Sequence, residues 1–361
     1  MLFNSYVFLL GFLPLVLAGW WGLRPDALRL GFLTLASWVF YAWWDWRFLP
    51  LLVLSTSVDW VAARLIDGSE DGRRRRAVLV AALGINLGIL GFFKYAGFFL
   101  ASLDGLGRLV GADPHLPSLD IVLPIGISFY TFNSLSYTID VYRRVVRPAD
   151  SVLQYTAFVA LFPHLIAGPI VRFADLHEQL RRPARRLTGE LAWAGLVFLV
   201  CGLVKKVVIA DGLAGDVDLL FAVHGSLGMA GAWAAALGYS LQLYFDFSGY
   251  SDMAVGLALL LGFHFPQNFD SPYKSASIAE FWRRWHMSLS FWLRDYLFIP
   301  LGGSRGSRLE TLRIKKDVFL SLLKEFPELS IEMMKVLASR LARTTAELTD
   351  ARNRLKAAGA H

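Results

Sequence analysis

The chain has 361 residues, of which 55% are hydrophobic, 14% aromatic and only 18% charged. Its mean hydropathy of +0.47 is well above that of a soluble domain of this size, so we expect most of it in a bilayer. The net charge of +7 comes from basic residues in short loops between apolar runs, which membrane topology explains more economically than a nucleic-acid partner. The single cysteine, Cys201, excludes a disulfide within the chain, and we interpret it as a buried apolar residue.

Apolar segments follow one another along the chain, and most reach the roughly 20 residues that cross a bilayer as a helix. They lie near residues 2 to 22, 27 to 45, 48 to 66, 77 to 103, 121 to 141, 152 to 171, 191 to 212, 229 to 246 and 250 to 265. The first has no small-residue cleavage site, so we expect an anchor and not a removed signal peptide. The sequence therefore predicts an all-α polytopic membrane protein.

The basic loops predict how these spans are oriented. Arginine clusters at 73 to 76 and 143 to 147 are expected in the cytoplasm, which places the N-terminus outside. Simple alternation would then put a third cluster, at 181 to 186, on the wrong side. Two prolines and a glycine between 163 and 169 break the intervening span, so we expect it to enter and leave on the cytoplasmic side. Because broken helices at membrane depth need protein or water around them, residues 152 to 172 are expected to line a cavity.

Polar side chains inside the spans are candidates for that cavity, since an ionisable group in hydrocarbon costs about 2.5 to 3.5 kcal/mol. The candidates are Asn133, Asp140, His164, Lys205, Lys206, Asp211, Gln242, Asp246 and Asp252. Structural pairing is an equally good interpretation for some: Asp140 with Arg143, and Lys206 with Asp211 about one turn away. We favour a cavity role for Asp246 and Asp252, which flank an apparent helix break.

Residues 280 to 303, EFWRRWHMSLSFWLRDYLFIPLGG, combine aromatic and charged side chains around one histidine. In a helix over 280 to 296, Trp282, His286, Ser290 and Leu293 would share one face. A histidine on an apolar face is commonly a structural residue, but burial keeps it neutral, which is also the form that a general base needs. Both interpretations of His286 stay open. Further candidates from this segment for substrate binding are Trp282, Arg283, Trp285, Arg294 and Asp295.

The remaining motifs give no metal or cofactor site. No HxxxH, HExxH or His/Cys cluster predicts zinc, and no GxSxG, Walker or GxGxxG motif stands in a suitable context. We expect no metal ion and no bound cofactor. The other histidines are assigned to solvent (His115, His177, His361) or to the membrane interface (His224, His264).

Several blocks of the sequence, taken in order, resemble a known family. They are SFYTFNSLSYTIDVYRR, FPHLIAGPIVR, VKKVVIAD, YSLQLYFDFSGYSDMAVGLALLLGFHFPQNFDSPY and EFWRRWHMSLSFWLRDYLFIPLGG. In this order they resemble the membrane-bound O-acyltransferase family over about residues 1 to 306, and within it most closely the bacterial alginate O-acetylation branch. The resemblance implies a ring of transmembrane helices around a funnel, with a re-entrant segment.

The same resemblance implies an activity. It is transfer of an acyl group, expected to be acetyl from a donor such as acetyl-CoA, to an extracytoplasmic polysaccharide such as alginate. It also implies a bacterial inner-membrane location in contact with membrane lipids and a periplasmic acetyl-transfer partner. Transfer of D-alanine to teichoic acid is the rival substrate assignment within the family.

The sequence departs from the family pattern after residue 303. Family members continue with further helices and a second histidine, in a GLWHG-like block, that is usually assigned the catalytic role; these 361 residues contain no such block. His286 matches the other family histidine, which supports the site. We therefore expect an incomplete helical ring, and no transfer above background by this chain alone.

Residues 309 to 361 form a different, soluble and mainly helical tail. LETLRI, DVFLSLL and the helix that begins at PELS resemble the C-terminal end of a cyclic-nucleotide-binding domain. The barrel that would hold the nucleotide is missing from the sequence, so cyclic-nucleotide binding is not expected. Two resemblances that are each cut within a domain meet near residues 304 to 309, which favours a gene fusion, a deletion or an assembly artefact over a regulated enzyme.

Two functions of other classes remain beside the acyltransferase. The chain could be a catalytically inactive membrane scaffold that keeps the donor-side funnel. It could also be a transporter with a regulatory tail, which intramembrane charges and broken helices suggest; the absence of an evident inverted repeat ranks this last.

Overall fold

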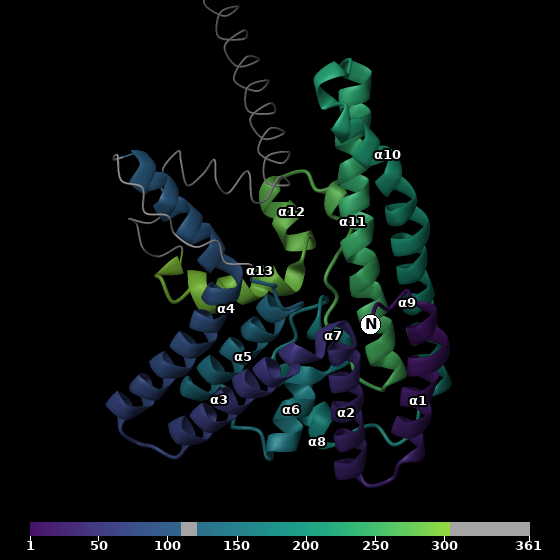
Figure 1. Cartoon of the computed structure of the whole chain (residues 1–361). Helices are drawn as coiled ribbons and strands as arrows, with labels where there is room; N and C mark the ends of the chain where they lie inside the picture. Colours follow the sequence, from purple (N-terminus) through teal and green to yellow (C-terminus); the bar gives the residue numbers. More distant parts are fainter. Residues whose placement is uncertain (110–120, 304–361) are drawn as a thin grey trace, which may run out of the picture.

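The computed structural model describes residues 1 to 109 and 121 to 303, and within these residues every regular element is a helix. The predicted tail at 309 to 361, His115 and His361 lie outside the described residues. Three helical stretches are long and apolar enough to cross a membrane: Asp26–Asp67, Gly72–Leu106 and Gly189–Ala222. The protein is an all-α polytopic membrane protein, as the sequence predicts (Figure 1).

The N-terminal helices run across the molecule from one side to the other (Figure 1). They are η1 (Val7–Phe12), α1 (Leu13–Gly22), α2 (Asp26–Asp45), η2 (Trp46–Phe48), α3 (Leu49–Asp67) and α4 (Gly72–Leu109). Prolines stand in the first turn of α1 and of α3, where a missing N–H costs no helical hydrogen bond. Between α2 and the centre of the molecule the rings of Phe8, Phe40 and Phe162 pack against one another and are fully buried.

A broken segment follows α5 (Ile127–Tyr142) and fills the centre. It consists of α6 (Val152–Ala160), the single turn α7 (Phe162–Leu165), an extended stretch and α8 (Phe173–Arg181). At its start Gln154 Nε2 donates to the carbonyl oxygen of His177 in α8, at 3.3 Å, so the segment returns to the end from which it came. The chain path agrees with the expected re-entrant segment, whose placement in the membrane stays a prediction. Most of the segment is packed core, and Ile170, Arg172 and Asp175 are its residues that line the cavity described below.

Two long helical rods stand beside α1. They are α9 (Gly189–Leu203), which continues through η3 (Val204–Ala210) into α10 (Asp211–Ala222), and α11 (Met229–Leu260). The predicted helix break between Asp246 and Asp252 is wrong, because α11 runs through it. A β-carbon at Gly202 would lie 2.6 Å from the carbonyl oxygen of Gly249. Gly249 therefore serves close packing of α11 on α9 and does not interrupt the helix.

Cys201 lies on the face of α9 that points away from α11. It is exposed on α9, so the prediction of a buried cysteine is wrong. Its neighbour Gly202 faces α11, which turns the cysteine outward toward the surroundings of the bundle.

The predicted helix over 280 to 296 is also wrong. The structure has η4 (His224–Ser226) before α11, then η5 (Pro272–Lys274), α12 (Ile278–Arg284), α13 (Met287–Leu293) and η6 (Arg294–Phe298). Trp285 is extended and His286 is left-handed between α12 and α13, so the expected common face of Trp282, His286 and Leu293 does not form.

The basic loops gather at one end of the molecule, the lower edge of Figure 1. Arg75 donates to the carbonyl oxygen of Tyr142 at 2.7 Å, which joins the start of α4 to the end of α5. Arg185 pairs with Asp26 at 2.7 Å, which joins the loop after α8 to the start of α2. The positive-inside rule assigns this end to the cytoplasm.

Candidate functional site

His286 stands in the break between α12 and α13, outside the membrane-spanning helices. Its ring lies edge to face with Phe247 of α11 at 4.8 Å and 6.4 Å from the ring of Phe129 of α5. Burial lowers the pKa of His286 to about 4, so the imidazole is neutral at physiological pH. Its Nε2 is buried and has no hydrogen-bond partner among the described residues.

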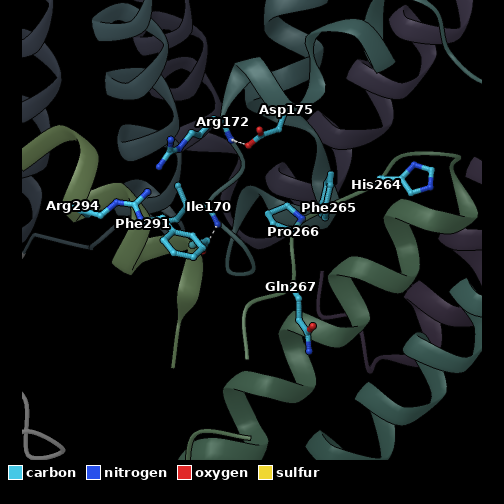
Figure 2. A pocket seen from close by; sticks show the side chains of 10 residues that line it. Ile170, Arg172, Asp175, His264, Phe265, Pro266, Gln267, Phe291 and Arg294 are labelled. Atoms are coloured by element: carbon cyan, nitrogen blue, oxygen red, sulfur yellow. Dashed lines mark hydrogen bonds between the residues drawn. The ribbon is translucent and has the colours of Figure 1, made fainter. Parts of the chain in front are cut away.

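An open cavity of about 550 Å³ has Ser288, two residues after His286, in its wall, and Figure 2 shows the side chains that line it. Its walls come from the re-entrant segment, from the extended chain after α11 and from α13 with the start of η6. The lining residues are Ile170, Arg172, Asp175, His264, Phe265, Pro266, Gln267, Ser288, Phe291 and Arg294. A volume of this size, with apolar walls and a few charged groups, is typical of small-molecule sites.

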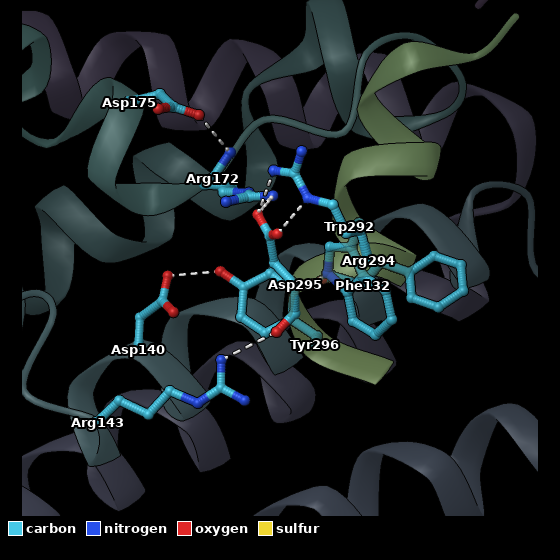
Figure 3. A network of polar contacts seen from close by, with 9 residues as sticks. All are labelled: Phe132, Asp140, Arg143, Arg172, Asp175, Trp292, Arg294, Asp295 and Tyr296. Carbon is cyan, nitrogen blue, oxygen red and sulfur yellow. Dashed lines mark hydrogen bonds and ion pairs between the residues drawn. The ribbon is translucent and has the colours of Figure 1, made fainter. Parts of the chain in front are cut away.

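Two arginines on one side of the cavity share one carboxylate (Figures 2 and 3). Asp295 pairs with Arg172 at 2.7 Å and with Arg294 at 2.6 Å. The Arg294 guanidinium, followed by that of Arg172, holds the pKa of Asp295 below its usual range. Asp175 also lines the cavity and accepts the main-chain N–H of Arg172 at 3.3 Å, so two guanidinium groups and two carboxylates meet in this part of the wall.

The segment that carries Asp295 is fixed to α5 by buried contacts (Figure 3). The Tyr296 hydroxyl donates to Asp140 Oδ2 at 2.6 Å, and the Trp292 indole donates to the carbonyl oxygen of Phe132 at 3.1 Å. Arg143 donates to the main-chain oxygen of Asp295 at 3.2 Å. Asp140 therefore pairs with a tyrosine from the end of the described chain.

His164 and Asn133 lie together in the core and do not line the cavity. His164 is fully buried; its Nδ1 lies 3.1 Å from Asn133 Nδ2 and its Nε2 lies 2.9 Å from the Phe158 carbonyl oxygen. A neutral ring with the proton on Nε2 satisfies both contacts. Both nitrogens of this histidine are thus engaged in the packing of the re-entrant segment on α5.

The charged candidates of the two rods form ion pairs with one another. Lys205 of η3 pairs with Asp252 of α11 at 2.6 Å. Lys206 pairs at 2.6 Å with both Asp211 and Asp246. These pairs tie η3 to α10 and α11 at a height where an unpaired charge would be costly.

The other candidates do not line the cavity. Trp285 stacks on Phe281 with ring centroids 5.5 Å apart, whereas Trp282 is 43% exposed and Arg283 is exposed. Gln242 Oε1 is buried without a hydrogen-bond partner in the described part of the chain. Of the candidates named from the sequence, Arg294 lines the cavity itself.

Residues 1 to 109 and 121 to 303 contain no group of three or more metal-binding side chains. The residues that were not among the sequence candidates are Asn268 behind the cavity wall and nine in the wall itself: Ile170, Arg172, Asp175, His264, Phe265, Pro266, Gln267, Ser288 and Phe291. Arg172 lay within the broken segment, but its position next to Arg294, far along the chain, had no signal in the spacing.

Comparisons with known proteins agree with this architecture. The model of the MBOAT family, the membrane-bound O-acyltransferases, matches residues 141 to 320. The chain is 47% identical over 324 residues to the probable alginate O-acetylase of Pseudomonas aeruginosa, covering 90% of this chain and 61% of that protein. It is 38% identical to the peptidoglycan O-acetyltransferase of Helicobacter pylori, over 89% of this chain and 65% of the relative.

A more distant relative is the teichoic acid D-alanyltransferase of Bacillus subtilis, 30% identical over 52% of this chain and 47% of its own length. The chain spans about three fifths of the length of the alginate O-acetylases that it matches. With the helical membrane architecture and the ordered sequence blocks, these matches show that the chain belongs to the membrane-bound O-acyltransferase family.

Proposed function

We propose that this protein is a membrane O-acyltransferase that moves an acetyl group from a cytoplasmic donor toward an extracytoplasmic polysaccharide. The observation that carries the proposal is the open cavity whose wall includes Ser288, two residues beyond the neutral, partly buried His286. The cavity lies beside α8, at the end of the molecule that the basic loops assign to the cytoplasm.

The charge at the cavity edge fits a phosphate-bearing donor such as acetyl-CoA. Arg172 and Arg294 present two guanidinium groups that both pair with the carboxylate of Asp295. Guanidinium groups bind phosphate oxygens in a forked geometry, whereas Phe265, Pro266 and Phe291 offer apolar surface to the rest of a donor. We infer that the phosphates bind at the arginines and that the acyl end points toward His286.

His286 suits the chemistry of such a transfer. The acceptor hydroxyl oxygen bonds to the acetyl carbonyl carbon, its proton passes to a neutral imidazole, and the donor thiol leaves and takes up a proton. The unpartnered Nε2 of His286 is available for this contact. In the family resemblance His286 supports a second histidine, so it acts either as the base or as the group that orients the acceptor.

The relatives support acetyl and polysaccharide as the two substrates. Those with the highest identities among the matches are named as alginate O-acetylases and a peptidoglycan O-acetyltransferase, whereas the D-alanyltransferases are less similar and match about half of the chain. We therefore propose acetyl transfer to an alginate-like polymer in the bacterial inner membrane, completed with a periplasmic partner.

Donor binding tests the proposal without requiring the remaining part of the longer relatives. Radiolabelled acetyl-CoA should bind the full chain in detergent, and Arg294→Ala should weaken binding by about tenfold, the loss of a contact worth roughly 1.4 kcal/mol. Arg108→Ala, at the far end of α4 and in an exposed pair with Asp104, is the matched control and should bind like wild type. No saturable binding by wild type would contradict the proposal.

Reconstituted chain supplied with acetyl-CoA and an alginate oligomer separates the two roles of His286. Transfer that disappears in His286→Ala assigns the base to His286. Donor binding without transfer assigns that step to the family's second histidine.

A further inference from the structure

We propose that Asn268 is a positioning residue that caps α13 in place of His286 and thereby keeps the His286 imidazole free for the acceptor. This role rests on the proposed function, because it concerns the histidine beside the donor cavity. Asn268 itself lies behind the cavity wall and is 2% exposed, so it touches no substrate.

The start of α13 shows why a cap from elsewhere is needed. The first N–H groups of a helix have no partner within it, and the N-cap side chain ordinarily accepts one of them. His286 holds the N-cap position of α13 and makes no such bond with its side chain. The N–H groups of Met287 and Ser288 would otherwise be left without acceptors in a largely buried place.

Asn268 supplies the missing acceptors. Its main-chain oxygen accepts the Met287 N–H at 2.9 Å. Its side-chain Oδ1 accepts the Ser288 N–H at 3.3 Å and the Ser288 hydroxyl at 2.9 Å. One residue from the extended chain after α11 thus does what the N-cap side chain does in most helices.

The capping group is itself held from two directions. Asn268 Nδ2 donates to the Ser251 hydroxyl oxygen of α11 at 3.1 Å. The Ser288 hydroxyl oxygen accepts the main-chain N–H of Ile170, in the re-entrant segment, at 2.8 Å. The start of α13 is therefore fixed to the rod, to the extended chain and to the cavity wall at once.

The backbone of His286 depends on these contacts. Its φ of 42° lies in the left-handed region, which a residue with a side chain adopts only where its surroundings fix it. On the other side of the break the N–H of Asp270 donates to the carbonyl oxygen of Arg284 at 2.9 Å. The bonds of Asn268 and Asp270 thus bracket Trp285 and His286.

The cap from Asn268 determines where the His286 imidazole lies. Because Asn268 satisfies the helix start, the His286 ring turns to Phe247 and Phe129 with its Nε2 buried and unpartnered. Without the cap we expect the break to relax and the ring to gain water or a main-chain partner, either of which changes its titration.

The experiment follows the His286 imidazole in the full chain by NMR, with ¹⁵N-labelled histidine in detergent and the signal assigned with His286→Gln. We expect titration near pH 4 in wild type and a rise of at least one pH unit in Asn268→Leu, which removes the side-chain acceptor. Asn268→Thr keeps a neutral side-chain acceptor at the helix start and should titrate closer to wild type than Asn268→Leu. Ser288→Ala should shift it in the same direction as Asn268→Leu, by less.

Asn86→Leu is the matched control, since Asn86 is another buried asparagine, bonded to Asp59 and Ser55 away from α13. It should lower thermal stability and leave the His286 titration unchanged. An unchanged titration in Asn268→Leu, or an equal shift in Asn86→Leu, would overturn the proposal. If Asn268→Leu does not fold, an unchanged titration in Ser288→Ala overturns it.

A separate measurement of donor binding distinguishes failure of the Asn268 proposal from failure of the proposed function. The titration requires no donor, so failure of acetyl-CoA binding would count against the proposed function alone. Asn268→Leu should still bind acetyl-CoA, because the arginines at the cavity edge do not contact Asn268.

Discussion

At the residue scale, the neutral state of His286 links stability to pH. Its pKa is lowered to about 4 in the folded chain, against about 6.5 for an exposed histidine. As pH falls from about 6.5 to about 4, the unfolded chain takes up a proton that the folded chain does not, so the free energy of unfolding decreases. For one group the slope is at most about 1.4 kcal/mol per pH unit.

We therefore expect the thermal midpoint in detergent to fall between pH 7 and pH 5, and His286→Phe to remove part of that fall. His224→Phe changes an exposed histidine and should keep the wild-type dependence. Identical pH profiles of wild type and His286→Phe would show that His286 is not held neutral by burial.

The bond between Tyr296 and Asp140 gives a second prediction at this scale. Tyr296→Phe removes the donor at 2.6 Å and leaves a buried carboxyl group without it. The expected loss in the free energy of unfolding is roughly 1 to 3 kcal/mol, measured by thermal or denaturant unfolding in detergent. Tyr6→Phe, at a tyrosine that is 83% exposed, should change stability little. Equal losses in the two variants would contradict a structural role for this bond.

The sequence identifies the polar residues inside the membrane spans, but it does not identify the partner that each of them contacts. The free-energy cost of a polar group in hydrocarbon made Lys205, Asp252, Asn133 and His164 candidates. Lys205 and Asp252 bind each other although they lie 47 residues apart along the chain, and Asn133 and His164 do so across 31 residues. Spacing on one helix predicts neighbours such as Lys206 and Asp211, and that pair forms. Pairs between helices depend on packing that spacing does not encode.

At the element scale, the glycines of α9 and α11 test how the two rods pack. Gly202→Ala would place a β-carbon 2.6 Å from the Gly249 oxygen, so we expect the rods to separate at a cost of about 1 to 3 kcal/mol. Gly212→Ala, at a glycine with no atom within 4 Å of its added β-carbon, should be neutral or slightly stabilising. Thermal unfolding in detergent measures both, and a stable Gly202→Ala would contradict close packing.

Both wrong element predictions have one physical cause. The glycine and serines before Asp252 suggested a break, but a partner rod against Gly249 keeps α11 helical. The continuous pattern over 280 to 296 suggested a helix, but contacts from Asn268 and Asp270 break it at His286. Tertiary contacts overrode local pattern in both places.

At the scale of the whole molecule, the basic loops lie at one end, which predicts that this end faces the cytoplasm. In a Cys201→Ser background, Arg74→Cys and Arg182→Cys should resist a membrane-impermeant maleimide in intact cells or right-side-out vesicles. Arg47→Cys should react, because α2 carries it about 30 Å from the basic end. Labelling of Arg182→Cys from outside would contradict the re-entrant course.

The family, the helical class and the broken central segment could be predicted from composition, hydropathy and ordered blocks. The cavity could not, because its walls come from three segments between Ile170 and Arg294 that meet only in the fold. The sequence predicts a candidate site around His286, whereas the residues that surround this histidine could be identified only in the structure.

Photolabelling tests most directly the central claim, that the cavity beside His286 holds the acyl donor. A photoreactive acetyl-CoA analogue should label peptides that contain residues 264 to 267 and 288 to 294, and excess acetyl-CoA should prevent this. Saturable labelling confined to other helices, or labelling that acetyl-CoA does not prevent, would contradict the account.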